Sequence, residues 1–184
     1  MTKSLQEKIN KEIQPVMQKK YGWTNPNMIP KIRRVVVNVG IRSDLKDPKI
    51  IDEFIKDIKA ITGQTPVKTR AKKSISSFKI RDGQVVGLMV TLRGKRMYEF
   101  LDKLLNITLA RVRDFRGLSP DGFDRQGNYS IGLRDQIAFP EISTDSVAHL
   151  FGLQITISLD ARKPEEAREY LKMLGLPLKK TIDI

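Results

Sequence analysis

Cysteine is absent from this sequence of 184 residues, and histidine and tryptophan occur once each. Without cysteine the chain can form neither disulfides nor thiolate metal sites, and with one histidine a structural zinc site is excluded as well. We therefore expect no metal and no cofactor, and a reducing compartment is compatible with the composition.

Long apolar runs are missing too. The longest strong one is VVVNVGI (Val35–Ile41), far short of the roughly 18 apolar residues typical of a membrane-spanning helix. The N-terminal stretch MTKSLQEKINKEI lacks the apolar segment of a secretory signal, and its acidic residues argue against a transit peptide. These features predict a soluble protein that stays where it is made and has no membrane partner.

Acidic residues are scarce in one region of a strongly basic chain. Lys and Arg number 34 against 21 acids, for a net charge of +13, and residues 58–98 carry +9 of it with a single acid. Because this excess of positive charge is confined to one region, it favours a polyanionic partner: nucleic acid is the first candidate and an anionic membrane surface the second. A peripheral membrane protein would use a basic amphipathic helix, whereas these cations fall on predicted strands and a loop.

Catalytic constellations are also missing. The stretch Gly87–Arg96 has six residues between its glycines where a phosphate-binding loop has four, and Arg96 replaces the required Ser or Thr. His149 has acids and a serine nearby in sequence, but a catalytic triad requires groups that converge in space. We expect no enzymatic activity and no small-molecule substrate.

Hydrophobic periodicity predicts an α+β fold, in which helices pack on one face of a mostly antiparallel sheet and leave the other face open. The predicted strands cover residues 32–40, 65–70, 85–93 and 153–159. The predicted helices begin near Ser4, Pro48, Gly94 and Pro164, with Ser4 and Glu7 forming a capping box and Pro15 kinking or ending the first helix. Residues 125–133 could form a hairpin, and residues 139–152 a long loop. No repeat or linker interrupts the chain, which predicts a single domain over 1–184.

Side chains alternate across a strand, so each predicted strand divides into two faces. One set is apolar and should lie under the helices; it includes Val35, Val37, Val39, Val67, Leu88, Val90, Leu92, Leu153, Ile155, Ile157 and Leu159. The opposite set forms hydrogen bonds and contains no carboxylate: Arg34, Asn38, Gln64, Lys68, Arg70, Thr91, Arg93, Gln154 and Thr156. For one strand an ordinary solvated face would be the simpler interpretation. Four strands in agreement favour RNA, because a shallow sheet suits the wide minor groove of an A-form helix.

The stretch KTRAKKSISSFKIRDG (Lys68–Gly83) passes six cations before its first acid, Asp82. A charge run of this kind is usually solvated and often disordered. An aromatic side chain among cations can instead stack on a base or ribose. Composition leaves the two interpretations about equal for the loop 71–82, whose candidate contact residues are Lys72, Lys73, Ser74, Ser76, Ser77, Phe78, Lys79 and Arg81.

The stretch ITGQTPVKTRAKKSI (Ile61–Ile75) resembles the signature of large-subunit ribosomal protein five, a universal family that binds 5S ribosomal RNA. Its constrained positions here are Ile58, Ile61, Thr62, Gly63, Gln64, Val67, Thr69, Ala71, Lys72 and Ser74. The segments KIRRVVVNVGI, GLMVTLRG, RDFRGL and GNYSIGLRDQIAFPEI also resemble the bacterial type, so the similarity covers nearly the whole chain. The tail KKTIDI after Leu178 is the one part that looks peculiar to this sequence.

This resemblance implies a structural, non-catalytic protein that holds 5S rRNA in the central protuberance of the large subunit, beside 23S rRNA and other ribosomal proteins. It implies a location on the ribosome in the cytoplasm of a bacterium or in a plastid. The open face would bind 5S rRNA, above all through Asn38, Gln64, Thr91 and Arg93. The loop 71–82, mobile in isolation, would reach the peptidyl-site (P-site) tRNA.

The resemblance further implies a bridge to a protein of the small-subunit head, ribosomal protein thirteen of the small subunit. The expected bridge residues are Arg113, Asp114, Arg116, Arg134 and Asp145. Two other functions stay open at this point. A general RNA chaperone would bind many RNAs alike, and a nucleic-acid-processing enzyme would need clustered carboxylates, of which the basic region has none.

Overall fold

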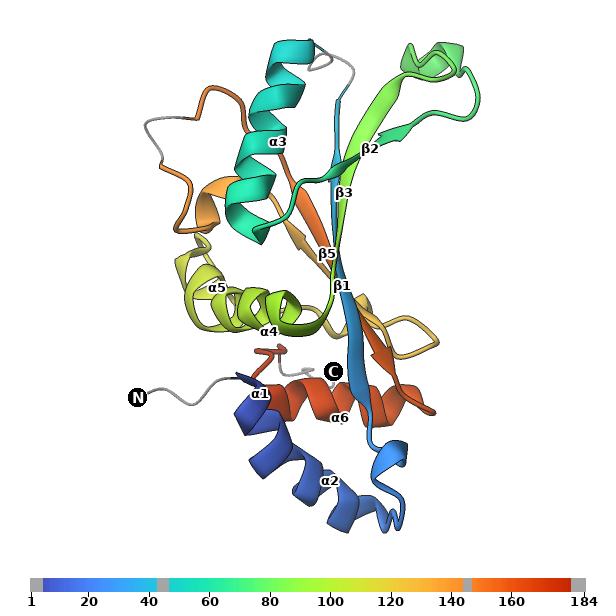
Figure 1. The fold of residues 1–184 in the computed structure, drawn as a ribbon, viewed down its shortest axis with the longest axis vertical. Helices are drawn as coiled ribbons and strands as arrows, with labels where there is room; N and C mark the ends of the chain where they lie inside the picture. Colours follow the sequence, from blue (N-terminus) through green and yellow to red (C-terminus); the bar gives the residue numbers. More distant parts are fainter. Residues whose placement is uncertain (1–4, 43–46, 144–146, 180–184) are drawn as a thin grey trace, which may run out of the picture. The chain divides into compact units, whose positions relative to one another are not determined.

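The computed structural model describes residues 5–42, 47–143 and 147–179 (Figure 1). The chain divides into two compact units. The first is drawn from Met1–Val35, Arg93–Ile131 and Thr156–Ile184, and the second from Val36–Leu92 and Gly132–Ile155. No helix among the described residues has the length and apolarity needed to cross a membrane.

Five strands form one sheet in the order β2-β3-β1-β5-β4. Their bounds are Lys31–Gly40 for β1, Val67–Arg70 for β2, Val85–Leu92 for β3, Tyr129–Leu133 for β4 and Leu153–Asp160 for β5. The sheet is antiparallel, which confirms the predicted α+β class. The alternation predicted for β1, β3 and β5 is also confirmed, since every apolar position named for those strands is at most 7% exposed.

In the second unit the helix α3 (Pro48–Thr62) packs on β3, and local signals in the sequence set both of its ends. Asp47 caps the N-terminus, where its Oδ1 accepts a 3.0 Å hydrogen bond from the Lys49 N–H, and Pro48 follows it. Gly63 ends the helix in the left-handed conformation, at φ +69°. Ile51, Phe54 and Ile58 form part of the buried stripe that faces the core.

The second unit also holds the loop between β4 and β5. Gln136, in the short 3-10 helix η6 (Gln136–Ala138), is fully buried there. Its Nε2 donates to the His149 carbonyl at 2.8 Å, and its Oε1 accepts from the Phe151 N–H at 2.9 Å. Phe151 in turn packs against Phe54 of α3, with ring centroids 4.5 Å apart. The returning end of the loop is therefore held in place where β5 begins.

The first unit contains the remaining long helices. The N-terminal one consists of α1 (Leu5–Lys8), a π-turn η1 (Ile9–Ile13) and α2 (Gln14–Tyr21). A second consists of α4 (Gly94–Lys103), the π-turn η4 (Leu104–Thr108) and α5 (Leu109–Arg111), and α6 runs over Pro164–Leu174. The segment α1 packs on α4, and η1 packs on α6. The Ser4 part of the predicted capping box lies outside the described residues.

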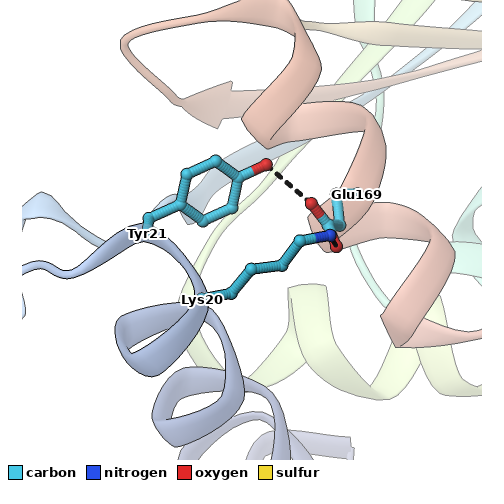
Figure 2. A network of polar contacts seen from close by, with 3 residues as sticks. All are labelled: Lys20, Tyr21 and Glu169. Atoms are coloured by element: carbon cyan, nitrogen blue, oxygen red, sulfur yellow. Dashed lines mark hydrogen bonds and ion pairs between the residues drawn. The ribbon is translucent and has the colours of Figure 1, made fainter.

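Pro15 does not end the first helix, although the sequence allowed for that outcome. Proline has no N–H to donate back to the previous turn, and its ring collides with the carbonyl four residues earlier. The wide π-turn directly before α2 relieves that conflict, and the helix continues to Tyr21. There Tyr21 Oη donates a 2.6 Å hydrogen bond to Glu169 of α6, and Lys20 forms an ion pair with the same carboxylate (Figure 2).

The predicted hairpin over 125–133 is present at its tip. Phe123 and Tyr129 form an antiparallel bridge on either side of the turn. Asp124 Oδ1 accepts hydrogen bonds from the N–H groups of Gln126 and Asn128, at 2.9 and 2.7 Å, and thereby holds the turn closed.

Candidate nucleic-acid interface

Among the described residues of the second unit, no helix covers one side of the strands (Figure 1). We call this side the open face; in this unit it carries the strand residues Val36, Asn38, Val67, Thr69, Gly87, Met89, Thr91 and Gln154. Asn38, Met89 and Thr91 are half-buried, and Gln154 is exposed. None of these residues is acidic: the open face combines amide and hydroxyl side chains with the apolar Val36, Val67 and Met89, and the exposed Arg70 lies at the end of β2.

Gln64 is positioned beside the open face by the end of α3. Because Gly63 turns the chain out of the helix, Gln64 folds back onto Thr62, whose Oγ1 accepts from the Gln64 N–H at 3.3 Å. The Gln64 side chain then reaches β3, where its Nε2 donates a 3.4 Å hydrogen bond to the Thr91 carbonyl. Gln64 and Thr91, which are 27 residues apart in the chain, therefore lie together.

The faces predicted for β2 are wrong, and the pairing with β3 shows why. Val67 pairs with Met89 and Lys68 pairs with Leu88. Partners in a ladder point to the same side of a sheet, so Val67 lies on the open face, 64% exposed, and Lys68 lies on the side of the buried Leu88. A register that differs by one residue reverses every side chain.

Lys68 accordingly turns toward α3. Its Nζ lies 3.6 Å from Asp52 Oδ1, in a solvated ion pair between two exposed side chains. The prediction that Lys68 shares a side of the sheet with Asn38 and Thr91 is therefore wrong. The register brings Thr69 to the open face instead, on the same side as Val67.

Arg70 is exposed at the end of β2, where the ladder with β3 becomes irregular. The register shifts between Thr69 and Arg70, so that Arg70 pairs with Val85 while Thr69 pairs with Gly87. The extra residue of this β-bulge, Val86, belongs to β3, so side chains keep alternating along β2 and Arg70 follows Lys68. Arg70 Nη1 donates to the Gly83 carbonyl at 3.3 Å, which holds the guanidinium near the base of the loop.

Three residues of the predicted RNA-binding set belong to the first unit: Arg34, Arg93 and Thr156. Arg34 and Arg93 are exposed, and Thr156 Oγ1 lies 3.0 Å from Ser130 Oγ. Arg33, which alternation did not single out, is exposed as well, because both arginines lie between the buried Ile32 and Val35. The first unit therefore has exposed cations of its own.

The loop 71–82 extends beyond β2 and β3, and main-chain hydrogen bonds close it (Figure 1). At its base the Ala71 N–H donates to the Gln84 carbonyl at 2.9 Å, and the Gly83 N–H donates to the Ala71 carbonyl at 3.0 Å. Farther out, Ile75 and Ile80 exchange hydrogen bonds of 2.9 and 3.1 Å. The loop is thus a second, narrower hairpin, which we call the tip hairpin.

The side chains of the tip hairpin point into solvent. A single 3-10 turn, η3 (Ser76–Phe78), forms its end, and Lys79 follows in the left-handed conformation at φ +50°. Phe78 is 65% exposed, and all four predicted cations (Lys72, Lys73, Lys79 and Arg81) are exposed. Ser74 has a structural role, because its Oγ accepts a 2.9 Å hydrogen bond from the Asp82 N–H.

The predicted bridge residues are distributed over both units. Arg113, Asp114 and Arg116 lie in the first unit, where Asp114 adopts φ +54° in the turn after α5. Arg134 follows β4 in the second unit. Asp145 lies outside the described residues. Among the described residues, no group of three or more histidines and acids could hold a metal ion.

Comparison with known proteins gives matches along both units. Residues 25–81 match the family described as "Ribosomal protein L5", and residues 85–178 match "ribosomal L5P family C-terminus". The large ribosomal subunit protein uL5 of Halothermothrix orenii is 53% identical over 173 residues, which is 94% of this chain and 97% of the relative. The uL5 proteins of Carboxydothermus hydrogenoformans and Dictyoglomus turgidum are each 49% identical, over 94% and 96% of this chain and 97% and 98% of their own lengths.

Proposed function

Because the chain belongs to the ribosomal L5 family, whose members are structural proteins of the large ribosomal subunit and not enzymes, we propose that it binds 5S rRNA through the open face. The family also places the protein on the ribosome, in contact with ribosomal RNA. The step to 5S rRNA, and to particular residues, is the proposal.

One observation carries it: the open face bears hydrogen-bonding side chains with no carboxylate among them. Exposed strand positions normally mix charges of both signs. Asn38, Gln64 and Thr91 offer amides and a hydroxyl, which suit ribose and base edges, while the exposed Arg70 at the end of β2 can neutralise phosphate. A shallow sheet fits the wide minor groove of an A-form helix, where the 2′-hydroxyls are displayed.

The tip hairpin supports a second contact. It extends past the end of the sheet, exposes four cations and presents Phe78 for stacking. We assign this contact to the P-site tRNA. The turn around Arg113–Arg116 and the loop after Arg134 would meet the small-subunit head protein, ribosomal protein thirteen of the small subunit, to form the intersubunit bridge.

A competition titration tests the proposal. The protein is titrated with 5S rRNA in the presence of excess bulk tRNA at several salt concentrations. If the open face recognises the shape of 5S rRNA, binding survives the competitor near physiological salt. If both RNAs bind alike and both are lost as salt rises, the chain is a general RNA binder that acts through its charge, and the proposal fails.

A further inference from the structure

Thr69 and Gly87 form an unusual pair on the open face, where the edge strand β2 meets β3. They are direct partners across β2 and β3. A Cβ built on Gly87 would lie 2.9 Å from Thr69 Oγ1 and 2.7 Å from the Val39 carbonyl oxygen, closer than real Cβ atoms approach such atoms. The Thr69 hydroxyl therefore occupies the space above Gly87 that any other residue would fill.

This arrangement fixes a hydroxyl against the backbone of the open face. Threonine is β-branched, so its χ1 is restricted, and the ladder with β3 holds the main chain on either side. Gly87 is itself buried, whereas Thr69 is half-buried and its neighbours Met89 and Thr91 are half-buried too. A partner bound to this face could reach the Thr69 hydroxyl without obstruction from position 87, because Gly87 has no side chain.

The chemistry of this position suits ribose. A threonine hydroxyl can donate one hydrogen bond and accept others, and a ribose 2′-hydroxyl has the same capacities. Phosphate offers acceptors only. We propose that Thr69 binds a 2′-hydroxyl of the bound RNA, beside a Gly87 whose place the Val39 carbonyl and this hydroxyl together keep free of a side chain. The inference rests on the proposed binding of 5S rRNA to the open face.

If Thr69 had only a structural role, covering Gly87 without binding RNA, two substitutions at this position would have different effects on RNA affinity. Thr69→Val keeps the branched shape and removes the hydroxyl, whereas Thr69→Ser keeps the hydroxyl and removes the methyl group. If cover alone mattered, valine would be tolerated and serine would be the worse replacement. If the hydroxyl binds RNA, the order is reversed. Thr65→Val, at an exposed position before β2, is the matched control.

The experiment is a double-substitution cycle. Titrations of wild type, Thr69→Val, Thr69→Ser and Thr65→Val use 5S rRNA assembled by ligation with single 2′-deoxy nucleotides, scanned along the segment that the protein protects. We expect Thr69→Val to raise Kd about fivefold, the loss typical of one hydrogen bond, and Thr69→Ser and Thr65→Val to bind like wild type. One 2′-deoxy position should weaken wild type about fivefold and leave Thr69→Val unaffected.

Two results would overturn the inference: Thr69→Val binding as tightly as wild type, or every 2′-deoxy position weakening Thr69→Val as much as wild type. Gly87→Ala adds an independent arm. If it folds, it should bind no better than Thr69→Val, and wild-type affinity would contradict the proposal; if it does not fold, the Thr69 cycle decides. Failure of the proposed function looks different, since wild type itself would then show no preference for 5S rRNA over tRNA.

Discussion

Lys68 Nζ lies 3.6 Å from Asp52 Oδ1 on the α3 side of β2, while the next residue in the chain, Thr69, lies on the open face against Gly87. The boundary between the two sides of the sheet therefore passes between these neighbours. Lys68 forms an ion pair with a residue of α3, whereas the Thr69 hydroxyl is available to RNA. Substitutions at these positions can therefore test the two sides of the sheet separately.

Lys68→Gln should leave both the 5S affinity and its salt dependence nearly unchanged, because Lys68 faces α3. The cost in stability should stay below about 1 kcal/mol, as is usual for an exposed ion pair. Arg70→Gln, which removes an exposed cation near the base of the tip hairpin, should lower the slope of log affinity against log salt by about one. Filter binding across a salt series measures both, and a slope that drops equally in the two variants would contradict the assignment of Lys68 to α3.

Asn38→Ala and Thr91→Ala should each weaken 5S binding about fivefold, the effect of roughly 1 kcal/mol for one hydrogen bond, with little change in salt slope because no charge is removed. Thr65→Ala, exposed before β2, is the control and should bind like wild type. The same titrations supply the readout. A reduced slope in either variant would mean that the lost contact was to phosphate through a displaced cation.

Lys72→Gln with Lys73→Gln should leave 5S binding nearly intact and weaken contact with P-site tRNA in assembled ribosomes. Both lysines lie in the tip hairpin, beyond the base closed by Ala71 and Gln84. Chemical footprinting of P-site tRNA on reconstituted ribosomes measures the contact. Loss of 5S binding by this double variant would disprove the separation of the two contacts.

The Tyr21–Glu169 hydrogen bond should make the first unit sensitive to acid (Figure 2). The hydrogen bond from Lys20, followed by that from Tyr21, lowers the pKa of Glu169 below its ordinary 4.5. A depressed carboxyl pKa stabilises the fold above the unfolded value, and this stabilisation is lost as pH falls through the folded one. The hydrogen bond to Glu169 also raises the pKa of Tyr21 to about 12, so its contribution persists below pH 10 and is lost as pH rises through 12.

Glu169→Gln should therefore lower stability at pH 7 and reduce the further loss on acidification below pH 4.5. The single tryptophan, Trp23, reports on this region because its ring stacks on Tyr21 at 4.8 Å. Urea unfolding followed by Trp23 fluorescence at several pH values measures the effect. Glu165→Gln on the same helix is the control, and an unchanged acid response in Glu169→Gln would contradict the assignment.

Where the sequence predicted structure correctly, the signals were local. The α3 helix has its own cap in Asp47, its own stop in Gly63 and a continuous apolar stripe between them. The strand β5 alternates over all eight residues and β3 alternates from Leu88 to Leu92, so their buried faces follow from the residues alone. The strongest elements of the fold were predictable for that reason.

The face of β2 was not predictable, because it is set by a partner strand. Four residues, Val67–Arg70, give too short a pattern, and the one apolar residue among them, Val67, lies on the exposed side. The pairing of Val67 with Met89 and of Thr69 with Gly87 decides which side chains of β2 reach the open face. The missing side chain of Gly87, which admits Thr69, carries no periodic signal at all.

The most direct test of the central claim asks whether RNA covers the open face or the opposite side. The chain has no cysteine, so Val67→Cys and Lys68→Cys each carry a single thiol, on opposite sides of β2. Alkylation rates are measured for both variants with and without saturating 5S rRNA. The account predicts that 5S rRNA slows the reaction of Val67→Cys strongly and leaves that of Lys68→Cys nearly unchanged. Equal protection of both thiols, or protection of Lys68→Cys alone, would contradict it.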